Sequence, residues 1–368
     1  MNYNSSFKIQ DQTISLNSPS YFIADIAANH DNDLSRAKEL IYLAAESGAD
    51  AAKFQHFTAE SIVSDLGFKN LGAQSSHQKN WKKSVYETYE DATLNADWTQ
   101  ALKETCDDAG IHFFTSPYSI ALVDYVDHFV PAYKVGSGDI TYIEVIKHMA
   151  KKDKPVILAT GASELLDVER AVSAILTINP NISIMQCNTN YTGSLENFKY
   201  INLNVLNTFR EKYPNMVLGL SDHTPGHATV LGAIALGARV IEKHFTDDNN
   251  RKGPDHPFSM TPQTWREMVD RSRELEASLG DGIKVIEDNE RETVVLQRRC
   301  LRLKRDMAEG EIIKEDDLTS LRPAPKGAFP PYEAKNIIGK ILLKNKDRSE
   351  EHTSELQSPC NLVCRLLL

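Results

Sequence analysis

Eight short apolar runs recur along the chain, and each of them ends in polar residues. The runs are 21–25, 51–55, 111–117, 131–139, 155–161, 182–191, 217–223 and 239–245. Runs of this length that are rich in Val, Ile, Phe and Ala are typical of strands buried on both faces. Buried strands whose polar residues gather at one end predict a parallel barrel with a site at the carboxyl ends of its strands.

Segments with apolar residues at helical spacing separate these runs. One of them, at 34–50, is closed by a glycine, and another, at 261–280, follows the last run. The alternation amounts to eight strand–helix units, the number that a (β/α)8 barrel requires. We therefore expect an α/β protein whose TIM-barrel catalytic domain covers residues 1–280.

The sequence changes character after Gly280. Short strand-like pieces, a charged turn and a Pro/Gly-rich crossing follow. They predict a linker at 281–290 and a small, mostly β domain at 291–347, which stops before the expected end of such a domain. Residues 348–368 begin with RSEEHTSELQS, which resembles a translated sequencing-library adapter, so we leave them out of the fold prediction. A natural polar extension is the alternative.

Charge and apolar pattern exclude several classes of protein. A formal net charge of −10 argues against nucleic acid as a partner, because nucleic-acid binders neutralise phosphates with Lys and Arg. No apolar stretch reaches the roughly 18 residues of a membrane span, and the polar start lacks the apolar core of an export signal. Outside the tail, Cys106, Cys187 and Cys300 form no pattern. We therefore expect reduced thiols and a cytoplasmic protein.

A long polar connection runs from Thr58 to about Ala92. Structureless loops of that length are uncommon and usually cover a site or bind something. Its aromatic residues Trp81, Tyr86 and Tyr89 can equally serve to pack the connection against the barrel.

Two histidines follow the seventh and eighth runs. His223 and His244 would come from neighbouring strands, and two neutral imidazoles can hold a divalent metal while other positions stay open. Asp222 and Glu242 flank them as possible orienting groups. Each histidine taken alone is more often a structural hydrogen-bonding residue.

Lysines and hydroxyls gather at the same strand ends. Lys53 and Lys134 follow apolar strands, where a lysine is costly unless it faces an anion. Ser137, Ser221 and Thr160 add hydroxyl donors. With the exposed backbone amides of the Gly136–Gly138 stretch, this set suits a phosphate group. A Schiff-base role for Lys53 is the alternative.

Acidic residues supply the candidates for proton transfer. Asp25 and Asp139 can transfer protons or order a water molecule, and either can instead be a counter-ion of the lysines. The full set of candidate catalytic residues is Asp25, Lys53, Asp139 and Glu242.

Several motifs resemble the sialic acid synthase family, whose members include legionaminic and pseudaminic acid synthases. The motifs are FIADIAANHDND, GADAAKFQHF, FFTSPYS, PAYKVGSGDI, LGLSDHTPG and EKHFTDDNNRKGPDHPFSM. The segment with LRPAPKG and NIIGK is similar to the family's antifreeze-like (SAF) domain. The resemblance implies a transferase that joins phosphoenolpyruvate to an N-acetylated hexosamine such as N-acetylmannosamine and releases phosphate.

The same resemblance assigns roles to residues of this chain. His223 and His244 would bind Mn²⁺ or Mg²⁺, and Arg322 would reach the partner's barrel in a domain-swapped homodimer. Lys53, Lys134, Ser137 and Ser221 would hold phosphoenolpyruvate, and Gln55, Tyr191 and Asp255 would contribute to the sugar side of the pocket. The remaining candidates for substrate binding are Ser116, Thr160, Asn188 and Arg322.

Departures from the family pattern leave the sugar open. Asp25 and Asp139 stand where Glu is common, Ala159 replaces a frequent Ser, and CNTNYTG lacks a frequent YP pair. Two other readings remain: a phosphoenolpyruvate-condensing enzyme that uses a phosphorylated sugar, and a non-catalytic carbohydrate-binding protein.

Overall fold

The computed structural model describes residues 2–71, 78 and 81–348. The chain divides into two compact units, the first ending at Gly280 and the second beginning at Asp281. The predicted adapter-like tail lies outside the described residues, apart from Arg348, as do Cys360 and Cys364.

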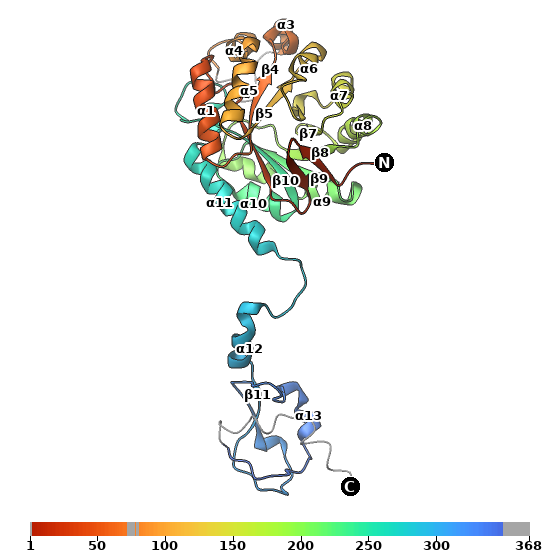
Figure 1. Ribbon diagram of the computed structural model, residues 1–368, viewed down its shortest axis with the longest axis vertical. Coiled ribbons are helices and arrows are strands. Elements are labelled where there is room, and N and C mark those ends of the chain that lie inside the picture. Colours follow the sequence, from red (N-terminus) through yellow and green to blue (C-terminus); the bar gives the residue numbers. More distant parts are fainter. Residues whose placement is uncertain (1, 72–77, 79–80, 349–368) are drawn as a thin grey trace. The chain divides into compact units, whose positions relative to one another are not determined.

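Eight parallel strands form the barrel of the first unit (Figure 1). They are β3 (Tyr21–Asp25), β4 (Ala51–His56), β5 (His112–Pro117), β6 (Tyr133–Val135), β7 (Val156–Ala159), β8 (Ile182–Cys187), β9 (Val217–Asp222) and β10 (Ala238–His244). The hydrogen-bonded order is β5-β4-β3-β10-β9-β8-β7-β6, and β5 and β6 at its two ends lie in contact. The predicted (β/α)8 barrel is confirmed, with each of the eight apolar runs supplying one strand.

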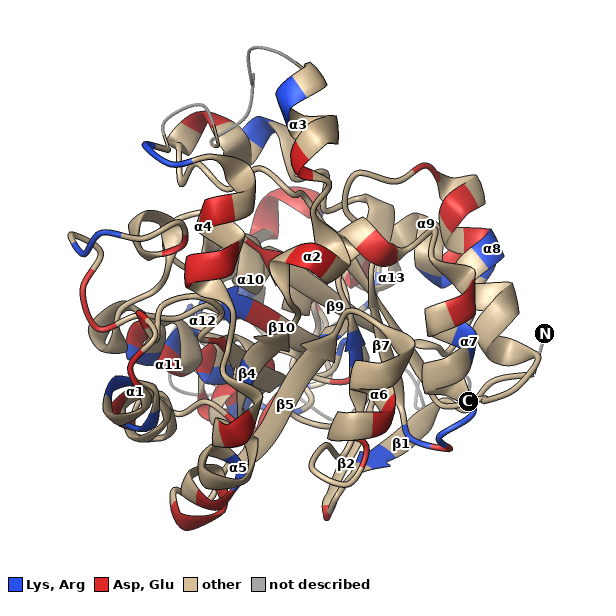
Figure 2. Cartoon of the chain, turned by 90° about the horizontal axis from the view of Figure 1, so that it is seen from above, with Lys and Arg blue, Asp and Glu red and all other residues tan. Residues whose placement is uncertain are grey.

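Helices cover the outside of this barrel at the predicted places. They are α1 (Leu34–Glu46), α5 (Thr99–Asp108), α6 (Ile120–Val126), α7 (Ile143–Ala150), α8 (Leu165–Leu176), α9 (Val205–Lys212), α10 (Ala228–Ala235) and α11 (Pro262–Leu279). Their apolar faces pack on the strands to form the main core. Figure 2 shows acidic and basic residues interspersed on the helices rather than gathered into one basic face.

A β-hairpin that the sequence analysis missed precedes the barrel. Strands β1 (Ser6–Ile9) and β2 (Gln12–Ser15) are antiparallel. Phe7, Ile9 and Ile14 are buried in a second core together with Tyr21 and other residues at the amino-terminal ends of the barrel strands. The hairpin therefore covers the end of the barrel opposite to the predicted site.

The connection from Thr58 to Ala92 contains short helices rather than a structureless loop. Its described residues form α2 (Ala59–Ile62), α3 (Asp65–Leu71) and α4 (Val85–Ala92). Thr58 and Ser84 are the N-cap residues of α2 and α4, and each forms a capping box. A capping box is a short-range sequence signal for the start of a helix, and here it lies in a polar stretch.

The second unit has a small core of its own. Helix α12 (Arg291–Gln297) precedes the antiparallel strands β11 (Cys300–Leu303) and β12 (Leu318–Leu321), and α13 (Ala334–Ile337) follows. Its buried apolar residues are Met307, Ile313, Ile337 and Leu342.

Two expectations drawn from composition can be compared with the structure. Cys106, Cys187 and Cys300 are free and buried, as predicted for reduced thiols. Among the described residues no helix is both long and apolar enough to cross a membrane.

Close packing inside the barrel predicts a stability effect at Gly219. A Cβ atom there would lie 2.5 Å from the backbone oxygen of Val240 and 2.9 Å from Met185 Cγ. Because a strand carbonyl cannot yield as a flexible side chain does, Gly219→Ala should cost about 1–3 kcal/mol of unfolding free energy. Urea denaturation followed by tryptophan fluorescence measures this, since all three tryptophans belong to the barrel unit.

Gly138→Ala is the matched control, because a Cβ atom there meets nothing within 4 Å. Equal denaturation midpoints for the two variants would contradict the packing argument.

Candidate active site at the carboxyl ends of the strands

A cavity of about 410 Å³ opens at the carboxyl ends of the barrel strands. Gln55 at the end of β4, Ser137 after β6 and His244 at the end of β10 line it, together with Tyr191 and Asp255 from the following loops. These five candidates therefore lie around one space, although they are far apart in the sequence.

Four buried charged side chains stand next to this cavity. Lys53 Nζ lies 2.7 Å from Asp25 Oδ2 and 3.2 Å from Glu242 Oε1, and Lys134 Nζ lies 3.2 Å from the same Glu242 oxygen. All four side chains are at most 5% exposed. Strands β3, β4, β6 and β10 each contribute one of them, so the barrel brings together two positive and two negative groups.

The pKa values of this charge quartet (Asp25, Lys53, Lys134 and Glu242) follow from burial and from mutual attraction. Burial disfavours the charged form of Lys53, but Asp25 and Glu242 outweigh it and raise its pKa. Burial likewise disfavours ionised Glu242, yet Lys134 and Lys53 lower its pKa to about 2. Burial raises the pKa of Asp25 and lowers that of Lys134. Because Lys53 is held as an ammonium ion, it is poorly suited to Schiff-base chemistry.

Hydroxyl groups surround the quartet, and they differ in whether the hydroxyl proton is already used in a hydrogen bond. Ser221 Oγ lies 3.3 Å from Glu242 Oε1, and Ser137 Oγ accepts a hydrogen bond from the Gly161 amide. Ser116 Oγ is buried without a hydrogen-bond partner. Thr160 already donates its hydroxyl proton to the Met185 carbonyl, and Ser221 donates its own to Glu242. Ser116 and Ser137 can therefore donate to an anion directly, whereas Thr160 and Ser221 would first have to release their present acceptors.

The two predicted metal ligands face each other across β9 and β10. The ring centroids of His223 and His244 are 5.3 Å apart. His223 Nδ1 lies 2.8 Å from the Asn188 carbonyl oxygen, which fixes the proton on Nδ1 and leaves the Nε2 lone pair free. His244 Nδ1 is buried without a hydrogen-bond partner. Burial first, and then the neighbouring positive or imidazole groups, lower both pKa values to about 3.

This arrangement fits a divalent metal as a partial coordination shell. Within the described part of the chain no three His, Cys, Asp or Glu side chains gather as a ready metal site. Two neutral imidazoles with a free or unpartnered nitrogen nevertheless supply two donors of the right chemistry, and further ligands would be water or substrate.

The expected orienting role of the flanking acids is wrong. Side chains alternate across a strand, so Asp222 points away from the cavity, where it pairs with buried Lys243 and accepts hydrogen bonds from Thr224 and Thr229. Glu242 points inward, but to the two lysines. His223 is oriented instead by the backbone oxygen of Asn188.

Two further carboxyl groups line the cavity. Burial raises the pKa of Asp139 to about 6 and that of Asp255 to about 7. Asp255 Oδ2 accepts a hydrogen bond from the Ala28 amide and lies 3.8 Å from His244 Nδ1. Asp139 therefore changes charge close to neutral pH.

The remaining candidates are placed less directly. The Asn188 side chain bonds to the Tyr200 carbonyl and the Asn190 amide, whereas Gln55 Nε2 lies 3.4 Å from Asp25 Oδ2. Arg322 belongs to the second unit, where its Nε donates to the Gln297 carbonyl at 2.6 Å. The barrel itself does not contain it.

An aromatic wall completes the cavity and was only partly foreseen. It consists of Phe57, Trp81, Tyr89 and Tyr118. Phe57 packs against Tyr89 and Tyr118, and Trp81 packs against Tyr89. The sequence indicates Trp81 and Tyr89 as residues that can pack the connection against the barrel. Tyr118 was not predicted; its signal is an aromatic residue directly after the end of a strand.

Comparison with known proteins identifies the family to which the chain belongs. The model of the NeuB family matches residues 40–284, and that of the SAF domain matches residues 298–346. An N,N'-diacetyllegionaminic acid synthase of Legionella pneumophila is 34% identical over 88% of this chain and 91% of its own length. A human N-acetylneuraminate-9-phosphate synthase is 31% identical over 92% of each chain.

Among solved structures, a sialic acid synthetase of Leptospira borgpetersenii in complex with citrate has a TM-score of 0.68 at 26% identity. The match covers 80% of this chain and 96% of that one. The family match spans most of the barrel unit and the SAF match most of the second. This chain therefore belongs to the NeuB family and carries a SAF domain after its barrel.

Proposed function

We propose that the protein is a nonulosonic acid synthase, which condenses phosphoenolpyruvate with an N-acetylated hexosamine and releases phosphate. One observation carries the proposal: Asp25 Oδ2 lies 2.7 Å from Lys53 Nζ and 3.6 Å from His244 Nε2. A group suited to an anionic phosphate and a group suited to a metal are therefore neighbours at one end of the barrel. Family membership and the names of the relatives support the same reaction.

In the mechanism, Lys53 and Lys134 would hold the phosphate and carboxylate of phosphoenolpyruvate, with Ser116, Ser137 and Ser221 as hydroxyl donors. A Mn²⁺ or Mg²⁺ ion held by His223 and His244 would act as a Lewis acid on the sugar aldehyde. With phosphoenolpyruvate and the sugar aldehyde held next to each other, the methylene carbon of phosphoenolpyruvate bonds to the aldehyde carbon, and the aldehyde oxygen takes up a proton.

Water completes the reaction and keeps its atoms in balance. It adds to the cationic carbon that bore the enol oxygen and gives up a proton, for which Asp139 is the proposed base. The carbon–oxygen bond to phosphate then breaks, the hydroxyl derived from water passes its proton to the departing phosphate, and the 2-keto acid remains. The first proton that water gives up balances the one that the aldehyde oxygen takes up. The raised pKa of Asp139 supports this role, because an effective base has a pKa close to the working pH.

The charge of the cavity wall supports a sugar without a phosphate group. Its described lining residues include Asp139 and Asp255 but neither Lys nor Arg. A phosphorylated sugar would bring negative charge to these carboxyl groups, whereas the aromatic wall and a neutral acetamido sugar are compatible.

A homodimer in which Arg322 of the partner subunit contacts the sugar is part of the same proposal. It rests on the family resemblance of the LRP motif. The place of action that we propose is the cytoplasm, in line with the free cysteines.

Substrate choice is the first prediction. With Mn²⁺ and phosphoenolpyruvate, the protein should release phosphate with one or more free sugars among N-acetylmannosamine and the 6-deoxy diacetamido hexoses, and at least about tenfold more slowly with 6-phosphorylated N-acetylmannosamine. A colorimetric phosphate assay across this panel checks it. Preference for the phosphorylated sugar would overturn the charge argument, and no release with any sugar would favour a binding protein.

The metal role predicts a paired loss of binding and turnover. His223→Ala and His244→Ala should each lower turnover by on the order of a hundredfold or more and weaken Mn²⁺ binding measured by electron paramagnetic resonance. His227→Ala is the matched control, because His227 lies at the start of α10 outside the cavity lining. Full turnover in chelator-treated buffer would refute the metal role.

Burial of Asp139 predicts how activity and stability depend on pH. The folded protein keeps the proton up to about pH 6, whereas the unfolded chain releases it near the ordinary value of 3.8. The stabilisation from this group is therefore present below about pH 4 and is lost as the pH rises through 6. Asp139→Asn should gain stability relative to the wild type over that range.

The wild-type kcat/KM should decrease as the pH is lowered below about 6. The Asp139→Asn variant should be slow at every pH and should lack this decrease at acidic pH. Glu144→Gln, at an exposed position of α7, should keep the wild-type profile. An unchanged acidic limb in Asp139→Asn would assign it to another group.

A further inference from the structure

Two loops that meet beside the cavity are joined by a polar network that the proposed mechanism does not use. The loop after β3 spans residues 26–33, and the loop after β10 spans residues 245–261. The first loop holds three non-glycine residues in the left-handed region, Ala27, Asp31 and Asn32, with φ of 47°, 50° and 54°. Such backbone is strained and persists only where its surroundings hold it.

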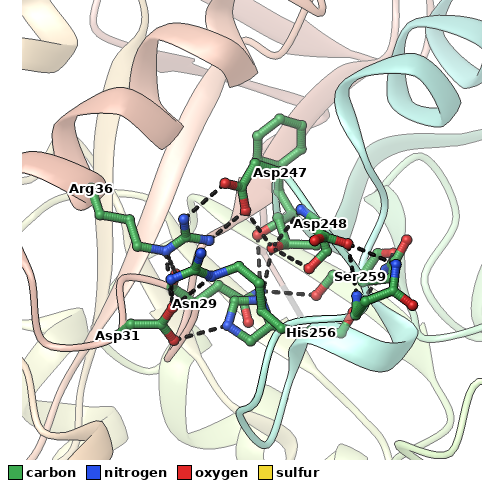
Figure 3. A network of polar contacts seen from close by, with 12 residues as sticks. Asn29, Asp31, Arg36, Asp247, Asp248, His256 and Ser259 are labelled. Atoms are coloured by element: carbon green, nitrogen blue, oxygen red, sulfur yellow. Dashed lines mark hydrogen bonds and ion pairs between the residues drawn. The ribbon is translucent and has the colours of Figure 1, made fainter.

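Arg36 in α1 is at the centre of this network (Figure 3). Its Nε donates to the Asn29 carbonyl at 2.8 Å and lies 3.1 Å from Asp31 Oδ2. Its two terminal nitrogens bind both carboxylate oxygens of Asp247. The Arg36 side chain is only 9% exposed and Asp247 is 29% exposed, so this bidentate pair is partly shielded from solvent and geometrically specific.

His256 links the same acid to the second loop. It is fully buried, with Nε2 2.9 Å from Asp31 Oδ1 and Nδ1 2.7 Å from Thr246 Oγ1. Figure 3 shows Arg36 and His256 both directed at Asp31. Asp31 therefore fastens α1 and its own loop to the turn that contains His256.

That turn carries Asp255, the residue immediately before His256. The Asp255 carboxylate accepts from the Ala28 amide at 3.2 Å, and its carbonyl accepts from Ser259 Oγ at 2.7 Å. Asn29 Nδ2 donates both to Ser259 Oγ and to the Phe245 carbonyl. Ala28 and Asp255, one from each loop, both line the cavity.

We propose that Arg36, acting with Asp31 and His256, is a positioning residue that fixes the Asp255 carboxylate for sugar binding. The inference rests on the proposed function, because it gives Asp255 its task in the sugar half of the cavity. Lys53 and Lys134 pair with Asp25 and Glu242 and are not part of this network. Its loss should affect sugar binding and leave phosphoenolpyruvate binding intact.

The test is a double-mutant cycle between Arg36 and Asp255 with separate KM values for the two substrates. Arg36→Met should raise KM for the sugar about tenfold or more, with KM for phosphoenolpyruvate changed less than about twofold. In an Asp255→Ala background, the same substitution should cause little further change, because the positioned group is gone. Arg36→Lys should recover only part of the loss, since lysine cannot bind Asp247 bidentately.

Arg273→Met is the matched control, because Arg273 pairs with Glu276 and the Ser20 carbonyl near the start of β3, away from the cavity. It should lower stability without changing either KM. Additive effects of Arg36→Met and Asp255→Ala, or an unchanged sugar KM, would overturn the proposal. If Arg36→Met fails to fold, the two KM values of Arg36→Lys and Asp31→Asn test the proposal instead, and KM for the sugar should be the one that rises.

Hydrogen exchange separates this proposal from the proposed function. Backbone amides of residues 253–260 should exchange faster in Arg36→Met and Arg36→Lys than in Arg273→Met, with no substrate required. Unchanged exchange there would overturn the positioning role whatever the activity. Wild-type protein that releases no phosphate with any sugar, while exchange responds as expected, would instead count against the proposed function and against the sugar-binding task of Asp255.

Discussion

The charge quartet of Asp25, Lys53, Lys134 and Glu242 is the constraint on which the site depends. An isolated charge in a barrel interior is prohibitively costly, and removing one partner of a buried pair typically costs about 3–5 kcal/mol. Two lysines can therefore lie here only because two carboxylates come with them. Such pairs are often no more stabilising than apolar residues, which points to a function in binding rather than in folding.

Strand alternation decides which charges belong to the site. In the register of the barrel, Glu242 is opposite Ser221 and Lys243 is opposite Asp222. The first pair faces inward and the second faces outward, where Lys243 and Asp222 are buried beside Thr224 and Thr229 of the loop and helix that follow. The same register places His223 and His244 next to each other on the inner side. One parallel ladder thus separates charges that face the barrel interior from structural charges that are adjacent to them in sequence.

The parts that could be predicted are those with a local signal. Eight apolar runs that end in polar residues predicted the strands and some of the cavity residues, among them Gln55, Ser137 and His244, because a parallel barrel brings all such ends together. Asp222 was misjudged because proximity to His223 in sequence was read without the alternation of the strand. The Arg36 network was not predicted, since Asp247 reaches Arg36 and His256 reaches Asp31 only after the barrel closes through the pairing of β3 and β10. The hairpin β1–β2 was missed because its four-residue strands lie in a polar stretch.

The two ends of the barrel have opposite physical characters. At the amino-terminal end, Phe7, Ile9 and Ile14 of the hairpin extend the apolar core, and burial of such surface stabilises the fold. At the carboxyl end lie left-handed backbone at Ala27, Asp31 and Asn32 and partnerless buried atoms of Ser116, Glu242 and His244. Each of these is unfavourable for folding alone. A site that binds polar ligands can keep unsatisfied polar atoms beside strained loops, because a bound ligand supplies the missing hydrogen-bond partners. The stabilisation from the apolar end can therefore offset the unfavourable free energy of the unsatisfied atoms and strained backbone at the carboxyl end, where the proposed site lies.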